Sequence, residues 1–235
     1  MQIYVSTQQG TKRKSNQDSL SFNNTFVNAN KKYETSQEIL NNNHNIFVLA
    51  DGMGGYSGGD YASNYVIREI YQEFSYNKNN FDINQCLNKI DDKLIEISKY
   101  DSNKSGMGTT VVAAIIKKNL VKVFNVGDSC LFHISGKSIS KRSVDDNLPG
   151  ANKSMITQCI GNFKQPLNIH TFNFEWKIND CLLLVSDGVS DFISEDKIIE
   201  LMNTYHSNKA ELLCNEAVSL GSTDDVSAMV LQNDQ

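Results

Sequence analysis

Several aspartates in this sequence stand where apolar segments end. Phe47–Ala50 leads directly into Asp51-Gly52, and Cys181–Ser186 leads into Asp187-Gly188. A carboxylate at the end of a buried strand is held rigidly at the edge of a sheet, and a glycine after it lets the backbone turn sharply. One Asp-Gly pair alone would indicate only an ordinary turn. Repeated at several strand ends, the pattern predicts an acidic site.

Further aspartates extend this pattern. Asp128 follows the apolar segment that ends at Val126, Asp224 precedes the last apolar segment, and Asp18 follows a basic run. Like charges gathered in a fold repel one another unless a cation neutralises them. Because all-oxygen ligands favour Mg²⁺, Mn²⁺ or Ca²⁺ over Zn²⁺, the predicted site holds hard divalent cations. Two such cations bridged by one carboxylate can lower the pKa of a water molecule and orient it for in-line attack on phosphorus.

The composition excludes several classes of protein. Lys and Arg number 22 and Asp and Glu 27, and the net charge of −5 argues against binding to nucleic acid. No apolar run has the length that crosses a bilayer, and the first residues lack a signal-peptide pattern, so we expect no membrane association and a cytoplasmic location. The 5 cysteines are scattered, which is typical of reduced thiols and argues against a zinc site. No heptad pattern is visible, and we expect a monomer.

Two other kinds of chemistry fail on spacing. The glycine-rich run 52–59 lacks the Gly-Lys-Ser/Thr ending of a nucleotide-binding loop. It also does not give Gly-x-Gly-x-x-Gly, because Ser57 stands at the third glycine position. Ser129 and Ser186 lack the Gly-x-Ser-x-Gly context of a hydrolase nucleophile. Neither a kinase nor a serine hydrolase fits the sequence.

Hydropathy predicts an α+β fold. Strands are expected at short alternating or β-branched runs: 3–6, 46–50, 109–116, 121–126, 130–134, 138–141, 169–174, 181–186 and 226–231. Helices are expected at 61–74, 83–97, 195–202 and 210–220, with Asp82 and Ser194 as N-caps. Asn28 to Asn45 and Asn147 to Ser154 are predicted as surface loops. Clustered strands without regular β-α-β alternation favour antiparallel sheets covered by helices.

A series of short motifs occurs in order along the chain. They are Arg13-x-x-Asn16-Gln17-Asp18, Asp51-Gly52-Met53-Gly54-Gly55, Gly106-Met107-Gly108-Thr109-Thr110, Gly127-Asp128-Ser129, Ser186-Asp187-Gly188 and Gly221-Ser222-x-Asp224. From about Arg13 to Leu231 the sequence resembles the metal-dependent type 2C (PPM family) Ser/Thr protein phosphatases in their compact bacterial form. The resemblance implies one catalytic domain over residues 1–235, folded as a four-layer α-β-β-α sandwich with two central antiparallel sheets flanked by helix pairs.

The resemblance also implies a metal centre with two Mn²⁺ or Mg²⁺ ions. Asp51 would bridge both ions, and Asp187 and Asp224 would complete the ligands of the first. The backbone carbonyl of Gly52 and the carboxylate of Asp18 would serve the second. A water or hydroxide that bridges the ions would then hydrolyse phosphoserine or phosphothreonine without a covalent enzyme intermediate.

Further residues match other parts of the family pattern. Arg13 would bind the phosphate, because its planar guanidinium matches a phosphoryl group better than a lysine does. Bacterial members often bind a third metal through an aspartate just before the Gly-Met-Gly-Thr-Thr motif. Here the best-aligned residue is Asn103, Asp101 is two residues earlier, and Asp145 matches an additional acidic position. Residues 146–155 form a short segment where relatives insert a longer flap.

These features predict an active protein phosphatase that acts on phosphoproteins, with a cognate Ser/Thr kinase as the expected partner. One alternative is a regulatory binding module that keeps the fold and has lost catalysis. Another is a phosphohydrolase that acts on small molecules. The presence of Asp18, Asp51, Asp187 and Asp224 favours the protein phosphatase. The sequence does not name the substrate or decide between Mn²⁺ and Mg²⁺.

Overall fold

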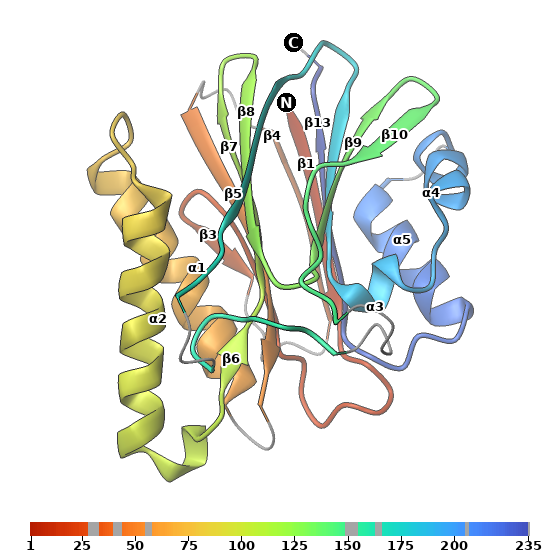
Figure 1. Ribbon diagram of the computed structural model, residues 1–235. Coiled ribbons are helices and arrows are strands. Elements are labelled where there is room, and N and C mark those ends of the chain that lie inside the picture. The colour runs from red at the N-terminus through yellow and green to blue at the C-terminus, as the bar shows by residue number, and fades with distance from the viewer. Residues whose placement is uncertain are drawn as a thin grey trace.

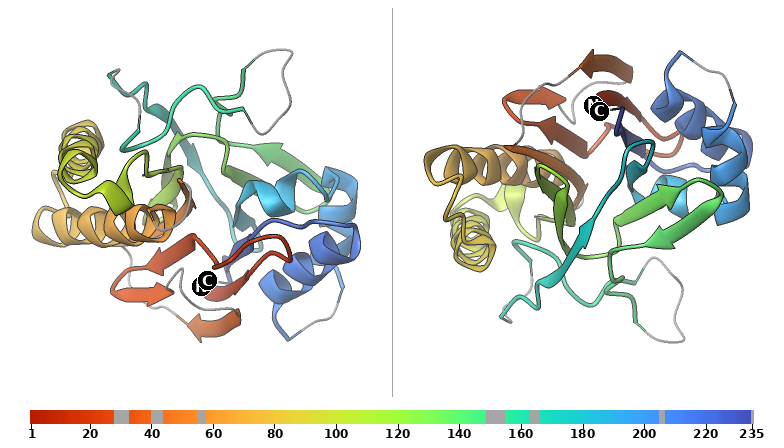
Figure 2. Two further views of the ribbon diagram at one scale, coloured as in Figure 1. Left: turned by 90° about the horizontal axis from the view of Figure 1, so that it is seen from below. Right: turned by 90° about the horizontal axis from the view of Figure 1, so that it is seen from above.

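The computed structural model describes residues 1–27, 44–54, 58–148, 155–162, 166–204 and 207–234, and the backbone of 33–39. Two antiparallel sheets lie face to face, with helices on both outer sides (Figure 1). Seen from below and from above, one pair of helices covers one sheet and a second group of helices covers the other (Figure 2). The predicted four-layer α+β sandwich is confirmed. No helix in the described ranges is long and apolar enough to span a membrane.

The first sheet, called here the β1 sheet, contains both the first and the last strand of the chain. Its order is β10 (Ser138–Lys141), β9 (Cys130–Ser135), β12 (Cys181–Val185), β13 (Val226–Gln232), β1 (Gln2–Gln8) and β4 (Tyr33–Ile39). The second sheet, the β5 sheet, has the order β11 (His170–Glu175), β8 (Leu120–Val126), β7 (Val111–Lys117), β5 (His44–Met53), β2 (Asp18–Phe22) and β3 (Thr25–Val27). The short strand β6 (Gly108–Thr109) pairs with the end of β5.

The helices cover the outer faces of the sheets. Helices α1 (Gly59–Tyr76) and α2 (Ile83–Tyr100) pack on the β5 sheet, and α4 (Glu195–Met202) and α5 (Lys209–Ser219) pack on the β1 sheet. A short helix, α3 (Asp187–Ser190), follows β12, and a 3₁₀ turn, η1 (Ser102–Lys104), follows α2. Apolar side chains fill the space between each helix pair and its sheet, and between the two sheets. Typical members of these three layers are Val66 and Leu87, Ile198 and Leu213, and Phe47 and Leu184.

The two predicted N-caps, Asp82 and Ser194, are confirmed. The carboxylate of Asp82 accepts hydrogen bonds from the backbone N–H groups of Asn84 and Gln85, at 3.0 and 3.1 Å. The hydroxyl of Ser194 accepts one from Lys197 at 3.3 Å. Each cap satisfies backbone donors that the first turn of a helix leaves without a partner.

The loop predicted for Asn28 to Asn45 is wrong in part, because this stretch contains β4 and the start of β5. Strand β4 is a polar sequence without alternating hydropathy, and its hydrogen bonds to β1 run along its whole length. Tertiary pairing thus overrides local propensity there. Strands β2 and β3 and helix α3 were also not predicted from the sequence. Of the second predicted loop, residues 149–154 lie outside the described residues.

Candidate active site

The strands bring carboxylates from both sheets to one place. Asp18 is the first residue of β2 and lies directly opposite Asp51 of β5 in the antiparallel register. Asp187 begins α3, directly after β12, and Asp224 comes shortly before β13. Two of these residues therefore belong to the β5 sheet and two follow or precede strands of the β1 sheet. We call Asp18, Asp51, Asp187 and Asp224 the acidic cluster.

Burial and mutual repulsion act on this cluster. Burial, followed by the charge of Asp225, raises the pKa of Asp18 well above its usual value. Burial, followed by the charges of Asp18 and Asp187, does the same to the pKa of Asp51. Burial and the charge of Asp224 raise the pKa of Asp187. A site that disfavours ionised carboxylates so strongly needs either protons or cations to compensate.

The donor set suits hard divalent cations. Both carboxylate oxygens of Asp18, and Oδ1 of Asp187, are buried without a hydrogen-bond partner among the described residues. Buried polar atoms are normally paired, so these oxygens are unsatisfied acceptors. The cluster offers only oxygen ligands, which is the preference of Mg²⁺ and Mn²⁺. Within the described ranges, however, no three His, Cys, Asp or Glu side chains are already grouped as ligands of one ion.

The conformation of Asp224 is one reason why the carboxylates are not already grouped around a single ion. Nε and Nη2 of Arg13 donate to the two carboxylate oxygens of Asp224 in a bidentate ion pair. This contact, and the neighbouring charge of Asp51, raise the pKa of the guanidinium. The Arg13 side chain is 48% exposed, so it can leave Asp224 without opening the core. Arg13 therefore lies beside the cluster and points its guanidinium group at it.

The backbone of Asp51 is held by the two threonines of the Gly-Met-Gly-Thr-Thr motif. The N–H of Thr110 and the hydroxyl of Thr109 donate to the carbonyl of Asp51, at 2.9 and 2.8 Å. The N–H of Asp51 donates to the Thr110 hydroxyl at 3.2 Å. At the next position only glycine fits, because a Cβ on Gly52 would lie 2.2 Å from the carbonyl oxygen of Gly59. These contacts fix the strand end that carries the central carboxylate.

Asp225 has a different task from its neighbour Asp224. Its two carboxylate oxygens accept hydrogen bonds from the backbone N–H groups of Gly10 and Gln17, both at 2.8 Å. These contacts tie down both ends of the loop that carries Arg13. Asp225 therefore positions the arginine loop rather than adding a free ligand to the acidic cluster.

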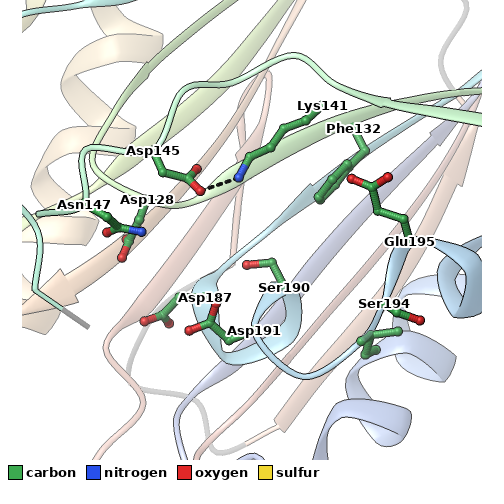
Figure 3. A pocket seen from close by; sticks show the side chains of 11 residues that line it. Asp128, Phe132, Lys141, Asp145, Asn147, Asp187, Ser190, Asp191, Ser194 and Glu195 are labelled. Carbon is green, nitrogen blue, oxygen red and sulfur yellow. Dashed lines mark hydrogen bonds and ion pairs between the residues drawn. The ribbon is translucent and has the colours of Figure 1, made fainter. Parts of the chain in front are cut away.

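A pocket of about 230 Å³ adjoins the cluster. Asp187 and Asp128 line it together, and Lys141 and Asp145 form an ion pair of 2.5 Å at its wall (Figure 3). Asp128 is only 7% exposed. Burial, followed by the charge of Asp187, raises the pKa of Asp128 to about 7. The pocket thus extends from Asp187 of the acidic cluster to Asp128 and Asp145.

Comparison with known proteins agrees with this arrangement. The profile of the family "Protein phosphatase 2C" matches residues 34–216. The chain belongs to the protein phosphatase 2C family. As a member of that family it is an enzyme, a protein phosphatase.

Relatives of this phosphatase are bacterial. It is 26% identical to the serine/threonine phosphatase stp of Listeria monocytogenes, over 82% of this chain and 86% of that protein. It is also 26% identical to the protein phosphatase PhpP of Streptococcus pneumoniae, over 100% of this chain and 99% of that protein. The solved serine/threonine phosphatase of S. agalactiae has the same fold, with a TM-score of 0.83 at 21% identity over 99% of this chain and 100% of that one.

The phosphatase does not bring all the predicted third-metal residues together. Asp145 lines the pocket, whereas Asp101 and Asn103 follow α2, where Asp101 forms an ion pair of 3.0 Å with Lys104. Asp128, which was not among the predicted third-metal residues, lines the pocket together with Asp187. The sequence pattern includes Asp128, because it follows a buried strand and a glycine, but the family motifs name no ligand there.

Proposed function

We propose that this phosphatase hydrolyses phosphoserine and phosphothreonine in proteins, by direct attack of water on phosphorus and without a covalent enzyme intermediate. The observation that carries the proposal is the acidic cluster, in which buried oxygens without partners lie beside an exposed arginine. The acidic cluster contains no cysteine or histidine that could act as a nucleophile. The relatives named serine/threonine phosphatases support the choice of phosphorylated residue.

The cluster would hold two Mn²⁺ or Mg²⁺ ions. The charges of Asp18, Asp187 and Asp224 all act on Asp51, which would be shared by both ions. Asp187 and Asp224 would bind one of them. Asp18 and the carbonyl of Gly52 would bind the other. When bound, such ions lower the pKa of a water molecule and neutralise charge on the phosphoryl group.

The chain's own residues do the rest. Arg13 would turn from Asp224 to the incoming phosphoryl group and bind two of its oxygens, because the guanidinium fork fits phosphate as well as carboxylate. This exchange would also leave Oδ2 of Asp224 for a cation, whereas Oδ1 still accepts the N–H of Asp225 at 2.7 Å. Thr109 and Thr110 hold Asp51 still, so that its carboxylate need not reorganise during the reaction.

Phosphoproteins of a partner Ser/Thr kinase are the substrates that this proposal expects. The pocket beside Asp187 could receive residues next to the phosphorylated one, which gives a peptide more contacts than a small ester has.

The test is release of phosphate from a phosphothreonine peptide by the pure protein, in Mn²⁺ and in EDTA. We expect release in Mn²⁺ only, and its loss in Asp187→Asn. Asp92→Asn, which removes an exposed aspartate on α2, is the matched control and should keep full activity. Retained activity in Asp187→Asn would refute the metal assignment. Faster turnover of nucleotides or sugar phosphates would favour a small-molecule enzyme, and no release by folded protein would favour a binding role.

A further inference from the structure

Gly127 and Asp146 are joined by hydrogen bonds, and the residue after each of them lines the pocket. Asp128 follows Gly127, and Asn147 follows Asp146. The N–H of Asp146 donates to the carbonyl of Gly127 at 3.1 Å, and the N–H of Gly127 donates to Oδ2 of Asp146 at 2.7 Å. This reciprocal contact fixes the spacing of Asp128 and Asn147, which lie near each other at one end of the pocket (Figure 3).

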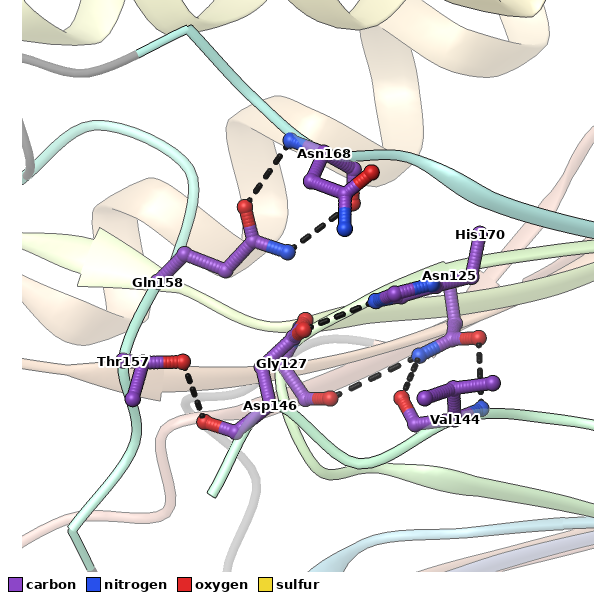
Figure 4. A network of polar contacts seen from close by, with 8 residues as sticks. All are labelled: Asn125, Gly127, Val144, Asp146, Thr157, Gln158, Asn168 and His170. Carbon is purple, nitrogen blue, oxygen red and sulfur yellow. Dashed lines mark hydrogen bonds and ion pairs between the residues drawn. The ribbon is translucent and has the colours of Figure 1, made fainter. Parts of the chain in front are cut away.

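A histidine binds the carboxylate oxygen of Asp146 that Gly127 does not contact. Nε2 of His170, on the edge strand β11, lies 2.8 Å from Oδ1 of Asp146. The carboxylate oxygen accepts, so the Nε2 nitrogen donates. His170 is 18% exposed and Asp146 is 9% exposed, so the contact is largely shielded from water. With Gly127 on the other oxygen, both oxygens of Asp146 are engaged (Figure 4).

Other contacts restrain the same place. The carbonyl of Asp146 accepts hydrogen bonds from the N–H and the hydroxyl of Thr157, at 2.6 and 3.0 Å. Asn125, opposite His170 in the β8–β11 register, exchanges hydrogen bonds with the backbone of Val144. Asp146 is therefore the common point of contacts from β11, from the Gly127 turn and from the Thr157 segment.

The two pocket residues offer acceptors for a ligand. Asn147 lines the pocket, and its Oδ1 is covered and has no hydrogen-bond partner among the described residues. Asp128 carries its carboxylate into the same space. Peptide N–H groups and basic side chains are the donors that such a pair of acceptors would bind.

We propose that His170 is a positioning residue for phosphopeptide binding, which acts through Asp146 to hold Asp128 and Asn147 at the wall of the pocket. The inference rests on the proposed function, because it assigns the pocket to substrate residues beside the phosphorylated one. His170 itself touches neither the acidic cluster nor the reacting phosphorus. Its loss should weaken peptide binding and leave the chemistry on a small ester intact.

The chain contains a matched control for this histidine. Nε2 of His133, on β9, lies 2.9 Å from Oδ2 of Asp180, and the two side chains are 11% and 6% exposed. Asp180 also accepts a backbone N–H, from Lys177 at 2.7 Å. This second pair repeats the chemistry of the first, but it stands at the start of β12, whereas Asp187 follows the end of that strand. Replacing His133 therefore removes the same kind of histidine–aspartate contact at a place away from the pocket.

The experiment compares His170→Phe, His170→Gln and His133→Phe with the wild type. Phe keeps a ring and removes the donor, whereas Gln keeps a donor. We measure kcat and KM for a phosphothreonine peptide and for an aryl phosphate, both in Mn²⁺. We also measure Kd for a fluorescent peptide with a non-hydrolysable phosphonate, and the melting temperature.

We expect His170→Phe to raise KM and Kd for the peptides roughly fivefold or more, as the displacement of binding groups implies, with aryl phosphate turnover within about twofold of wild type. His170→Gln should recover part of the affinity, and His133→Phe should change the melting temperature only. Equal losses on both substrates, or equal losses in the His170 and His133 variants, would overturn the inference. Unchanged peptide affinity in His170→Phe would overturn it as well. An inactive wild type would instead refute the proposed function.

Discussion

Asp18 and Asp51 lie directly opposite each other on adjacent antiparallel strands. Residues in this relation have side chains on the same face of the sheet, and like charges placed so destabilise the pair. Here burial adds to the repulsion, and the pKa of each carboxyl is raised, in the first place by burial. The fold therefore holds two buried carboxylates opposite each other, and their ionised forms are unfavourable until a proton or a cation joins them.

Asp18→Asn tests this relationship. The amide keeps the shape and removes one of the opposed charges, so the metal-free protein should melt higher, by roughly 2–4 °C for each kcal/mol of repulsion removed. The rise in melting temperature on adding Mn²⁺ should become smaller, and turnover should fall. Thermal melts in EDTA and in Mn²⁺ measure both effects. A lower metal-free melting temperature would show that Asp18 stabilises the fold in another way.

The stability of the metal-free protein should depend on pH through Asp128. Its folded-state pKa is raised from 3.8 to about 7, by burial first and then by the charge of Asp187, so the folded protein keeps a proton that the unfolded chain releases. The free energy of unfolding therefore falls as the pH rises from 3.8 to about 7, and Asp128 changes it no further above that. This contribution is on the order of 2–4 kcal/mol.

Urea unfolding in EDTA at several pH values across this window measures that loss. Asp128→Asn cannot ionise, so its stability should fall less steeply between pH 4 and 7 than that of the wild type. Parallel curves for the two proteins would contradict the raised pKa of Asp128.

Arg13→Ala should affect substrate binding more than metal binding. The arginine side chain is half exposed and forms its ion pair with Asp224. Its loss should therefore remove the proposed phosphate-binding group and leave the buried carboxylates in place. We expect KM for a phosphopeptide to rise about tenfold, the scale of one strong charged hydrogen-bonded contact. Arg13→Lys should recover little, because an ammonium cannot make the bidentate contact.

Steady-state kinetics at saturating Mn²⁺, with a Mn²⁺ titration at saturating peptide, separate the two effects for Arg13. Lys12→Ala removes an exposed charge one residue earlier and serves as control. A change in the Mn²⁺ requirement larger than the change in KM would contradict the assigned role.

Gly127→Ala should destabilise the phosphatase by about 2 kcal/mol or more. Gly127 has φ of +96°, and a Cβ there would lie 2.7 Å from the side chain of Thr110, which cannot retreat because it holds Asp51. Gly136→Ala is the control, since Gly136 has φ of +59° but nothing within 4 Å. It should lose only about 1 kcal/mol of backbone strain. Equal losses in urea unfolding would mean that the contact with Thr110 relaxes.

The parts of the fold that could be predicted are those that hydropathy marks by itself. Buried strands such as β12 and β7 are solid runs of Leu, Val, Ile and Ala, and α2 has an apolar stripe with a capping aspartate at its start. The ends of the apolar runs in β5, β8 and β12 located Asp51, Asp128 and Asp187 in the same way. The order of motifs then supplied the fold family, which hydropathy alone could not.

Other elements depend on contacts that no local pattern reveals. Strand β2 alternates Leu20 and Phe22 with Ser19 and Ser21, yet its serines are buried too, and the hydroxyls of Ser19 and Ser63 on α1 lie 3.0 Å apart. The alternation of apolar and polar residues predicts a strand with one exposed face, whereas both faces of β2 are buried. The His170–Asp146 contact spans 24 residues and two chain segments, so no spacing rule could have linked the two side chains.

The acidic cluster takes its members from both sheets, and this has a consequence for how the molecule opens. A cation shared by Asp51 of one sheet and Asp187 beside the other would join the two halves of the sandwich at that edge. Hydrogen exchange of the backbone amides in β5 and in β12 should then slow together as the metal concentration rises. In a cell that runs short of manganese and magnesium, the enzyme would lose catalysis and resistance to proteases together, and its abundance would follow the metal supply.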